Sequence, residues 1–344
     1  MNMLVQYKCP NCGNDMAFDA NSGTLSCPSC GRQENIETFP EANKIREFSN
    51  EEVNEYHCEN CGAEIMTDAD TTATNCDFCG APVVLADRLS GKLAPHEVIP
   101  FTITKEKAQE AFKQWCRNGR LTPKGFMTAD RIKNITGIYV PFWLYDTETR
   151  AKVHAKATRV RTYTRGDYIY TETDHFDLMR DVEVHYNRVP TDASEKMDDQ
   201  LMDKLEPFHY KDLKDFKMPY LAGYIAEKYN FDDKELFPRL KVKIDPYINS
   251  YVRSTMNGYS TVLSTEEQID TRQKRASYAL MPVWMVYYDY NNAVHTFAMN
   301  GQTGKVVGRP PISKGKVAAW FSSIAGGIFI AWKAFVLAAG GPLW

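Results

Sequence analysis

The sequence predicts a multidomain protein: two tandem small β zinc ribbons, an α+β middle domain and one C-terminal transmembrane helix. Three observations support this fold class. A cysteine cassette occurs twice, strand and helix patterns alternate through the middle of the chain, and a long apolar run lies near the C-terminus. We expect zinc ribbon 1 at residues 1–35, an acidic spacer at 36–54, zinc ribbon 2 at 55–88, the middle domain at 96–311 and the membrane helix at 317–343.

The two cysteine cassettes have the same spacing. Each contains two Cys-x-x-Cys pairs separated by 14 residues, and the segments that start at Tyr7 and Tyr56 share 10 of 25 residues. A Cys-x-x-Cys turn directs two sulfurs toward one metal ion, so the cassettes are predicted to hold two structural zinc ions. The predicted ligands are Cys9, Cys12, Cys27, Cys30, Cys58, Cys61, Cys76 and Cys79.

Disulfide bonds are the main alternative for these cysteines. The chain begins MNMLVQYKCP, which lacks the basic start and apolar core of a secretory signal, so we expect reduced cysteines in the cytosol. Four cysteines around an ion leave no position for water, which predicts a structural metal. His57, beside Cys58, is expected to be a surface residue of the knuckle, and a competing ligand is the alternative. Cys116, the ninth cysteine, is expected to be a buried thiol.

Charge is distributed unevenly along the chain. Residues 1–90 contain 5 basic and 15 acidic residues, a net charge of −10, whereas residues 91–344 carry 36 basic and 29 acidic residues, or +7. Binding to nucleic-acid phosphates requires cations, so the ribbons are predicted to dock protein partners. The alternatives are a nucleic-acid-binding protein linked to replication or transcription, and a zinc-dependent redox or storage protein.

The middle domain is predicted from two strand and helix patterns. In the first, Thr104 caps a helix; in the second, residues 240–244 form a strand and Asp245 caps the helix that follows. Pro-x-Trp strands and Val-His pairs then recur at a shift of 141 residues, beginning with Pro141 and Pro282. An internal duplication is therefore possible, with chance similarity as the competing explanation.

Hairpins are predicted from turn residues within this domain. A turn at Gly166–Asp167 follows a basic run at residues 150–165, and turns at Asn291–Asn292 and Asn300–Gly301 predict a meander. The first turn pairs Arg159 with Asp174, Arg161 with Glu172 and Tyr163 with Tyr170. It leaves four side chains unmatched: Arg150, Lys152, His154 and Lys156. The segments GQTGKV and HEVIP lack the residues of a phosphate loop and a zincin site, so neither an enzyme nor a small-molecule substrate is predicted.

The C-terminal segment is predicted to bind membrane lipid. From Val317 to Trp344 there is one charge in 28 residues, Lys333, which is expected to snorkel. A helix at residues 320–340 would be about 31 Å long, enough to cross the apolar core of a bilayer. The alternative is a helix that is buried in a soluble core or packed on a partner. Basic residues before the helix are Arg309, Lys314 and Lys316. The expected location is therefore the cell membrane, with a single-pass C-terminal anchor and a cytoplasmic N-terminal part.

Five features of the sequence point to a known family. They are the double CxxCG cassettes and the segments VIPFTITKEKA, GIYVPFWLYD, YLAGYIAEKY and FAMNGQTGKVVG. Together they resemble bacterial TFIIB-type zinc-ribbon proteins, including YdjG-like membrane proteins, over nearly the whole chain. Members are often described as primosomal-helicase-like, but this chain contains no helicase phosphate loop. The resemblance implies a membrane adaptor in envelope-stress assemblies with phage-shock or SPFH-type partners.

Overall fold

The computed structural model describes residues 4–38, 55–58, 61, 64–67, 70–76, 81–85, 94–117, 121–123, 135–290, 293–308 and 310–338. These residues form an 11-stranded mixed sheet, a 3-stranded sheet and a 2-stranded sheet. The strands are β1 (Leu4–Val5), β2 (Ala17–Asp19), β3 (Thr24–Ser26), β4 (Gln33–Glu34), β5 (Glu55–His57), β6 (Glu64–Met66), β7 (Thr71–Asn75), β8 (Pro82–Leu85), β9 (Glu97–Val98), β10 (Thr136–Arg165), β11 (Tyr168–Asp192), β12 (Lys214–Asp215), β13 (Ile225–Glu227), β14 (Thr261–Tyr290), β15 (Ala293–Asn300) and β16 (Val306–Gly308). The helices are α1 (Lys105–Arg117), α3 (Asp199–Leu205), α4 (Asp233–Ser254), α5 (Lys314–Ala338) and the short 3-10 helices η1 (Ile36–Thr38), η4 (Tyr210–Asp212) and η5 (Met218–Leu221).

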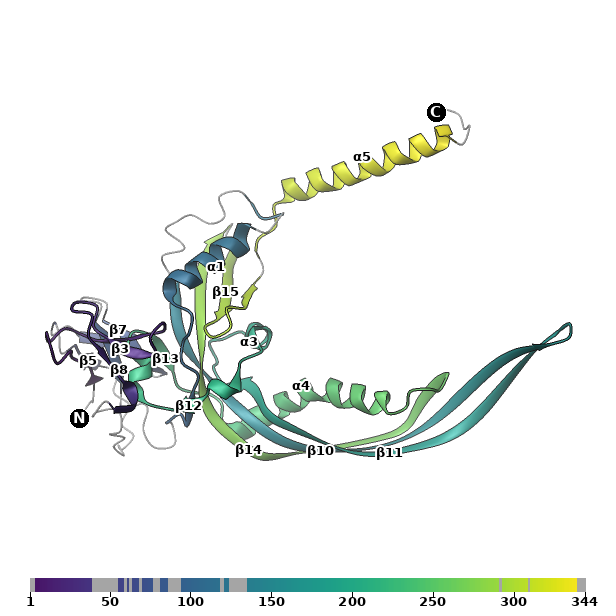
Figure 1. Cartoon of the computed structure of the whole chain (residues 1–344), viewed down its shortest axis with the longest axis horizontal. Helices are drawn as coiled ribbons and strands as arrows, with labels where there is room; N and C mark the ends of the chain where they lie inside the picture. Colours follow the sequence, from purple (N-terminus) through teal and green to yellow (C-terminus); the bar gives the residue numbers. More distant parts are fainter. Residues whose placement is uncertain are drawn as a thin grey trace.

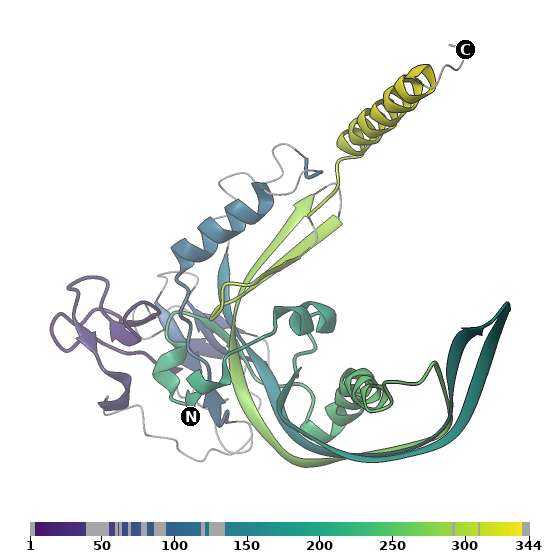
Figure 2. The ribbon, with the colours of Figure 1, turned by 45° about the vertical axis from the view of Figure 1, so that its right-hand side comes forward.

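Three long antiparallel strands form an arm that projects from the body of the molecule. β10 lies between β11 and β14 in this arm. Figures 1 and 2 show the arm curving away from the body, with α4 along its inner face and α5 projecting from another part of the body. Ala151, Val153, Ala155 and Ala157 alternate along β10 and are buried, so the inner face is the apolar one.

The predicted hairpin register is confirmed. Tyr163 pairs with Tyr170, and their rings stack with centroids 5.6 Å apart beside the turn at Gly166. The hairpin is longer than predicted, because β11 continues to Asp192. The expectation that Arg150 has no partner was therefore wrong, since its guanidinium makes two hydrogen bonds to the Asp181 carboxylate, at 2.9 and 2.7 Å.

The start of α4 differs from the prediction. Residues 240–244 belong to this helix, so the predicted strand and the predicted cap at Asp245 were both wrong. The helix begins instead after Asp232, whose carboxylate accepts hydrogen bonds from the backbone of residues 234 and 235. The side chain of Glu235 accepts a hydrogen bond from the backbone N–H of Asp232, which completes a capping box.

The helical period explains this correction. Leu240 and Ile244 are buried and lie four residues apart, a spacing that places them on one face of a helix as readily as on one face of a strand. Val242, between them, is 73% exposed. The complete buried face of α4 repeats every four residues: Leu236, Leu240, Ile244, Ile248 and Val252.

The first predicted helix is confirmed as α1. The hydroxyl of Thr104 accepts a hydrogen bond from the backbone N–H of Lys107 at 3.4 Å, as expected of a cap. Phe112 is buried, and Trp115 packs against the same core. The side chain of Cys116 lies outside the described part of the chain.

The C-terminal strands form the predicted meander, but the internal duplication is not confirmed. β14 pairs with β15, and β15 pairs with β16, around the turn that follows Asn300. The turn predicted at Asn291–Asn292 lies outside the described residues, between the paired Tyr290 and Ala293. Pro141 and Pro282 lie in adjacent strands; Pro141 pairs with Leu280. β14 and β15 are two separate strands that pair with each other, whereas β10 runs unbroken to its end.

The two cassettes have different surroundings, so two separate tandem ribbons are not confirmed. The first carries the three-stranded sheet β2-β3-β4. In the second, β7 pairs with β13 and β8 pairs with β1, which places this hairpin within the large sheet. The first cassette packs on the body through Phe18, whose ring lies 5.5 Å from that of Tyr220, and η1, which follows it, forms an ion pair between Glu37 and Lys217.

One described helix, α5, is long and apolar enough to cross a membrane. None of its apolar window is buried inside the molecule, so the alternative of a helix buried in this chain's own core does not apply. The helix starts at Lys314, before the predicted boundary. The backbone N–H of Ser313 donates to the carbonyl of Leu121 at 2.8 Å, and Lys316 Nζ donates to the carbonyl of Thr122 at 2.6 Å.

Candidate metal centres

The first predicted zinc site is assembled in the structure. Cys9 and Cys12 follow β1, Cys27 and Cys30 follow β3, and all four sulfurs lie within 4.8 Å of one another. The Sγ atoms of Cys9 and Cys30 are 3.5 Å apart, as are those of Cys12 and Cys27. A tetrahedral zinc ion with Zn–S bonds of about 2.3 Å separates its sulfurs by about 3.8 Å, whereas a disulfide needs about 2.05 Å. The geometry fits zinc and excludes these disulfides.

Two tight turns hold these sulfurs in place. The backbone N–H of Gly13 donates to the carbonyl of Cys9 at 2.8 Å, and that of Gly31 donates to the carbonyl of Cys27 at 3.0 Å. Gly13 and Gly31 have φ angles of 74° and 72°, which L side chains adopt at a cost. These turns therefore favour a glycine after Cys12 and another after Cys30.

Local electrostatics distinguish the sulfurs of this site. The backbone N–H of Arg32 lowers the pKa of Cys30 to about 6. The backbone of Asn14 lowers the pKa of Cys12, but hydrogen bonds with the other cysteine sulfurs and burial outweigh it and raise the value to about 12. A cation placed among the four sulfurs favours thiolates throughout, because it attracts each negative charge.

Three ligands of the second predicted site also come together. The sulfurs of Cys58, Cys61 and Cys76 lie within 4.8 Å of one another, with Cys61 and Cys76 at 3.8 Å. The backbone N–H of Cys76 donates to the carbonyl of residue 81 at 2.8 Å, which repeats the contact between Cys27 and residue 32 in the first site. Cys79 and the side chain of His57 lie outside the described residues.

One side chain outside the cassettes contacts this second cluster. Gln6, next to β1, is buried, and its Nε2 lies 3.6 Å from the sulfur of Cys58. Sequence reasoning missed Gln6 because no motif marks it, and its position follows from the long-range pairing of β1 with β8.

A different cluster lies on the arm, where Glu148, Glu183 and His185 approach one another. Glu148 forms an ion pair with Lys274, and His185 Nε2 lies 3.0 Å from a Glu183 carboxylate oxygen. These side chains are mostly exposed and already engaged with each other or with the lysine. We therefore interpret these side chains as a group of surface ion pairs and assign no metal to them.

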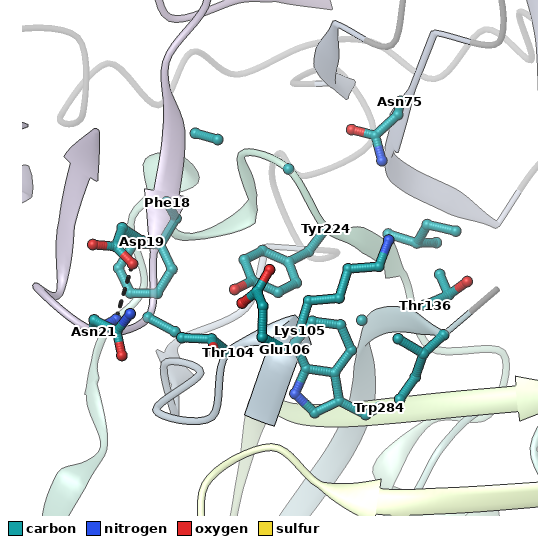
Figure 3. A pocket seen from close by; sticks show the side chains of 16 residues that line it. Phe18, Asp19, Asn21, Asn75, Thr104, Lys105, Glu106, Thr136, Tyr224 and Trp284 are labelled. Carbon is teal, nitrogen blue, oxygen red and sulfur yellow. Dashed lines mark hydrogen bonds between the residues drawn. The ribbon is translucent and has the colours of Figure 1, made fainter. Parts of the chain in front are cut away.

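A cavity of about 340 Å³ lies where the first cassette meets α1 and the large sheet. Figure 3 shows Phe18 and Asp19 from the cassette, Lys105 at the start of α1, and the aromatic rings of Tyr224 and Trp284 around it. Both acidic and basic side chains line the cavity. No single ligand charge is therefore favoured.

Comparisons with known proteins agree with this geometry. The family model TFIIB zinc-binding matches residues 7–48, which include the four cysteines of the first site. The chain is 63% identical over 339 residues to the uncharacterized protein YdjG of Bacillus subtilis (strain 168), and the alignment covers 98% of this chain and 99% of that protein. No solved structure matches. The N-terminal part of the chain thus matches a TFIIB-type zinc ribbon, and the chain as a whole belongs to the family of YdjG.

Proposed function

We propose that this protein is a membrane-anchored zinc-ribbon adaptor or scaffold that holds cytosolic protein partners at the membrane. Helix α5 carries the proposal. It runs over 25 residues and projects away from the body (Figure 1), and none of its residues is buried. An exposed apolar surface of this size is rare on a soluble monomer, and a bilayer is the environment that such a helix fits.

Lys333 is compatible with a bilayer. Its ammonium group lies 5.9 Å from the ring centroid of Phe329 and 5.7 Å from that of Trp332. Aromatic rings and a long lysine stem commonly occur together near a membrane interface, where the charge reaches the headgroups. Lys314 and Lys316 lie at the opposite end of the helix. The positive-inside rule then places the N-terminal part in the cytoplasm.

Of the two candidate docking surfaces for a protein partner, the ribbons and the tip of the arm (residues 160–171), we favour the tip of the arm. The apolar surface of the first cassette packs on the body, and the second is built into the large sheet. At the arm tip, by contrast, Tyr168 and Ile169 are 72% and 74% exposed. Tyr163 and Tyr170 are also exposed. Exposed tyrosines bury large areas with few rotatable bonds and are common at protein interfaces.

In this proposal the zinc ions are structural and the protein is not an enzyme. The resemblance to YdjG-like membrane proteins makes phage-shock and SPFH-type proteins the first partners to test. Binding of nucleic acid is not favoured, because the N-terminal 90 residues carry a net charge of −10. No small-molecule substrate is assigned.

Purification from detergent-solubilised membranes tests this proposal. The full chain should recover a phage-shock or SPFH-type protein, and the double variant Tyr168→Ser with Ile169→Ser should lose it while remaining in the membrane fraction. Tyr247→Ser, at an exposed position on α4, is the matched control and should retain the partner. If both variants recovered the same amount of partner, the docking surface would not be at the arm tip. Recovery of no protein by the full chain would contradict the adaptor role.

A further inference from the structure

Both metal centres are connected by one short segment. β1 pairs with β8, so that Leu4 lies opposite Leu85 and Val5 opposite Val84. The chain then passes through Gln6 and reaches Cys9, the first ligand of the first centre, three residues later. The same segment therefore contributes a strand beside the second centre and a ligand to the first.

Gln6 makes the direct contact between this segment and the second centre. Its side chain is 7% exposed, and Nε2 lies 3.6 Å from the Sγ atom of Cys58. Cys58 is itself buried, at 1% exposure, in a small apolar cluster that also contains Leu85. The amide of glutamine can donate two hydrogen bonds, and a thiolate can only accept, so the N–H group is the one that faces the sulfur.

We propose that Gln6 is an outer-sphere hydrogen-bond donor to the zinc-bound thiolate of Cys58, and that this contact couples zinc binding at the two centres. Four thiolates and one zinc ion carry a net charge of −2, and buried negative charge is stabilised by N–H groups aimed at it. Partners of this kind typically change metal affinity by about 10–100-fold. The inference requires zinc at both centres and does not depend on the membrane role.

Coupling follows from the path of the chain. Zinc at the first centre fixes Cys9, which limits the freedom of the preceding residues and keeps Gln6 against Cys58. Without that ion the segment has more conformations to lose when it docks beside the second centre. Because coupling between two binding equilibria is reciprocal, zinc at the second centre should strengthen the first to the same extent.

The test is a zinc competition titration against a chromogenic chelator, with the full chain in detergent. In the otherwise unaltered chain, Gln6→Met keeps the side-chain length and removes the donor, and it should weaken the second centre about 10-fold or more. A Cys9→Ser, Cys12→Ser chain, in which only the second centre binds, identifies the step of that centre in the titration. Gln6→Glu should weaken the second centre further, because a carboxylate repels the thiolates. Gln33→Met, at an exposed position of β4, should have no effect.

Two results would overturn the inference. Unchanged affinity of the second centre in Gln6→Met, with circular dichroism like that of the parent, would show that the amide does not support Cys58. The coupling is tested separately by comparing that centre in the unaltered chain and in the Cys9→Ser, Cys12→Ser chain. Equal affinities there would show that the two centres bind zinc independently, even if Gln6 supports Cys58.

Discussion

Trp143 and Trp284 lie in different strands and make equivalent hydrogen bonds from the indole N–H to a backbone carbonyl. The indole Nε1 of Trp143, in β10, donates to the carbonyl of Phe231 at 3.0 Å, and that of Trp284, in β14, donates to the carbonyl of Ile103 at 3.0 Å. Each accepting residue directly precedes the cap of a helix, α4 in the first case and α1 in the second. Each long strand is thereby tied to the start of one helix.

Replacing either indole should destabilise the fold by a similar amount. Trp143→Phe or Trp284→Phe removes the donor and leaves a carbonyl without its partner, which should lower the free energy of unfolding by about 1–2 kcal/mol in each case. Trp320→Phe, on exposed α5, should cause little change. Urea unfolding in detergent measures this difference. If only one of the two variants, Trp143→Phe or Trp284→Phe, lowered the free energy of unfolding, the two contacts would not be equivalent.

Metal analysis of the purified chain should find two zinc ions per molecule, because the described sulfurs of each cysteine cluster lie within 4.8 Å of one another. Cys9→Ser with Cys12→Ser should remove one ion at saturating zinc and leave the circular dichroism of the arm nearly unchanged. A single ion in the unaltered chain, or the visible absorption of an iron-sulfur cluster, would rule out two zinc centres.

The buried carboxylate of Asp192 should make stability depend on pH. Burial raises its pKa to about 6, although Arg239 Nη2 lies 2.6 Å from Oδ1 and opposes the shift. Between the unfolded value of about 3.9 and the folded value, the folded state binds more protons, so this group lowers stability as pH rises.

Comparison with Asp192→Asn isolates this effect, since the amide does not titrate. The free energy of unfolding of the parent, minus that of the variant, should fall by roughly 1–2 kcal/mol from pH 5 to pH 7.5. Taking this difference cancels the pH dependence of the zinc centres, which both proteins share. A difference that is constant or that rises with pH would show that the pKa is not raised.

Nucleic acid should not bind the full chain at physiological salt. The region of the two cassettes contains three acidic residues for each basic one, and phosphate binding depends on lysine and arginine. Fluorescence anisotropy with labelled single- and double-stranded DNA and RNA measures this. Micromolar binding that weakens as salt increases would instead favour the nucleic-acid alternative.

Local features of the fold could be predicted from the sequence. Cysteine spacing located the described ligands, Thr104 located the start of α1, and the turn at Gly166 set the register in which Tyr163 faces Tyr170. Each depends on residues close in sequence, where spacing and backbone preference decide the structure. Cys79 remains a prediction, because it lies outside the described residues.

Long-range relationships could not be predicted in this way. Nothing in the residues of β7 shows that it pairs with β13, and nothing beside Gln6 shows that it reaches Cys58. The error at residues 240–244 had a different origin, because alternation over five residues fits a helix face as well as a strand. The capping box at Asp232 and Glu235 was the local signal that could have corrected it.

Carbonate extraction of membranes tests the membrane anchor, which is the central claim, most directly. The full chain should sediment with membranes and resist salt and carbonate, because α5 is long and apolar enough to cross a bilayer. Lys333→Leu should behave in the same way, since the lysine is tolerated and is not required as an anchor. A chain that ends at Ser313 should move to the soluble fraction and keep both zinc ions. Full-length protein that stays soluble without detergent would contradict the anchor and with it the membrane adaptor.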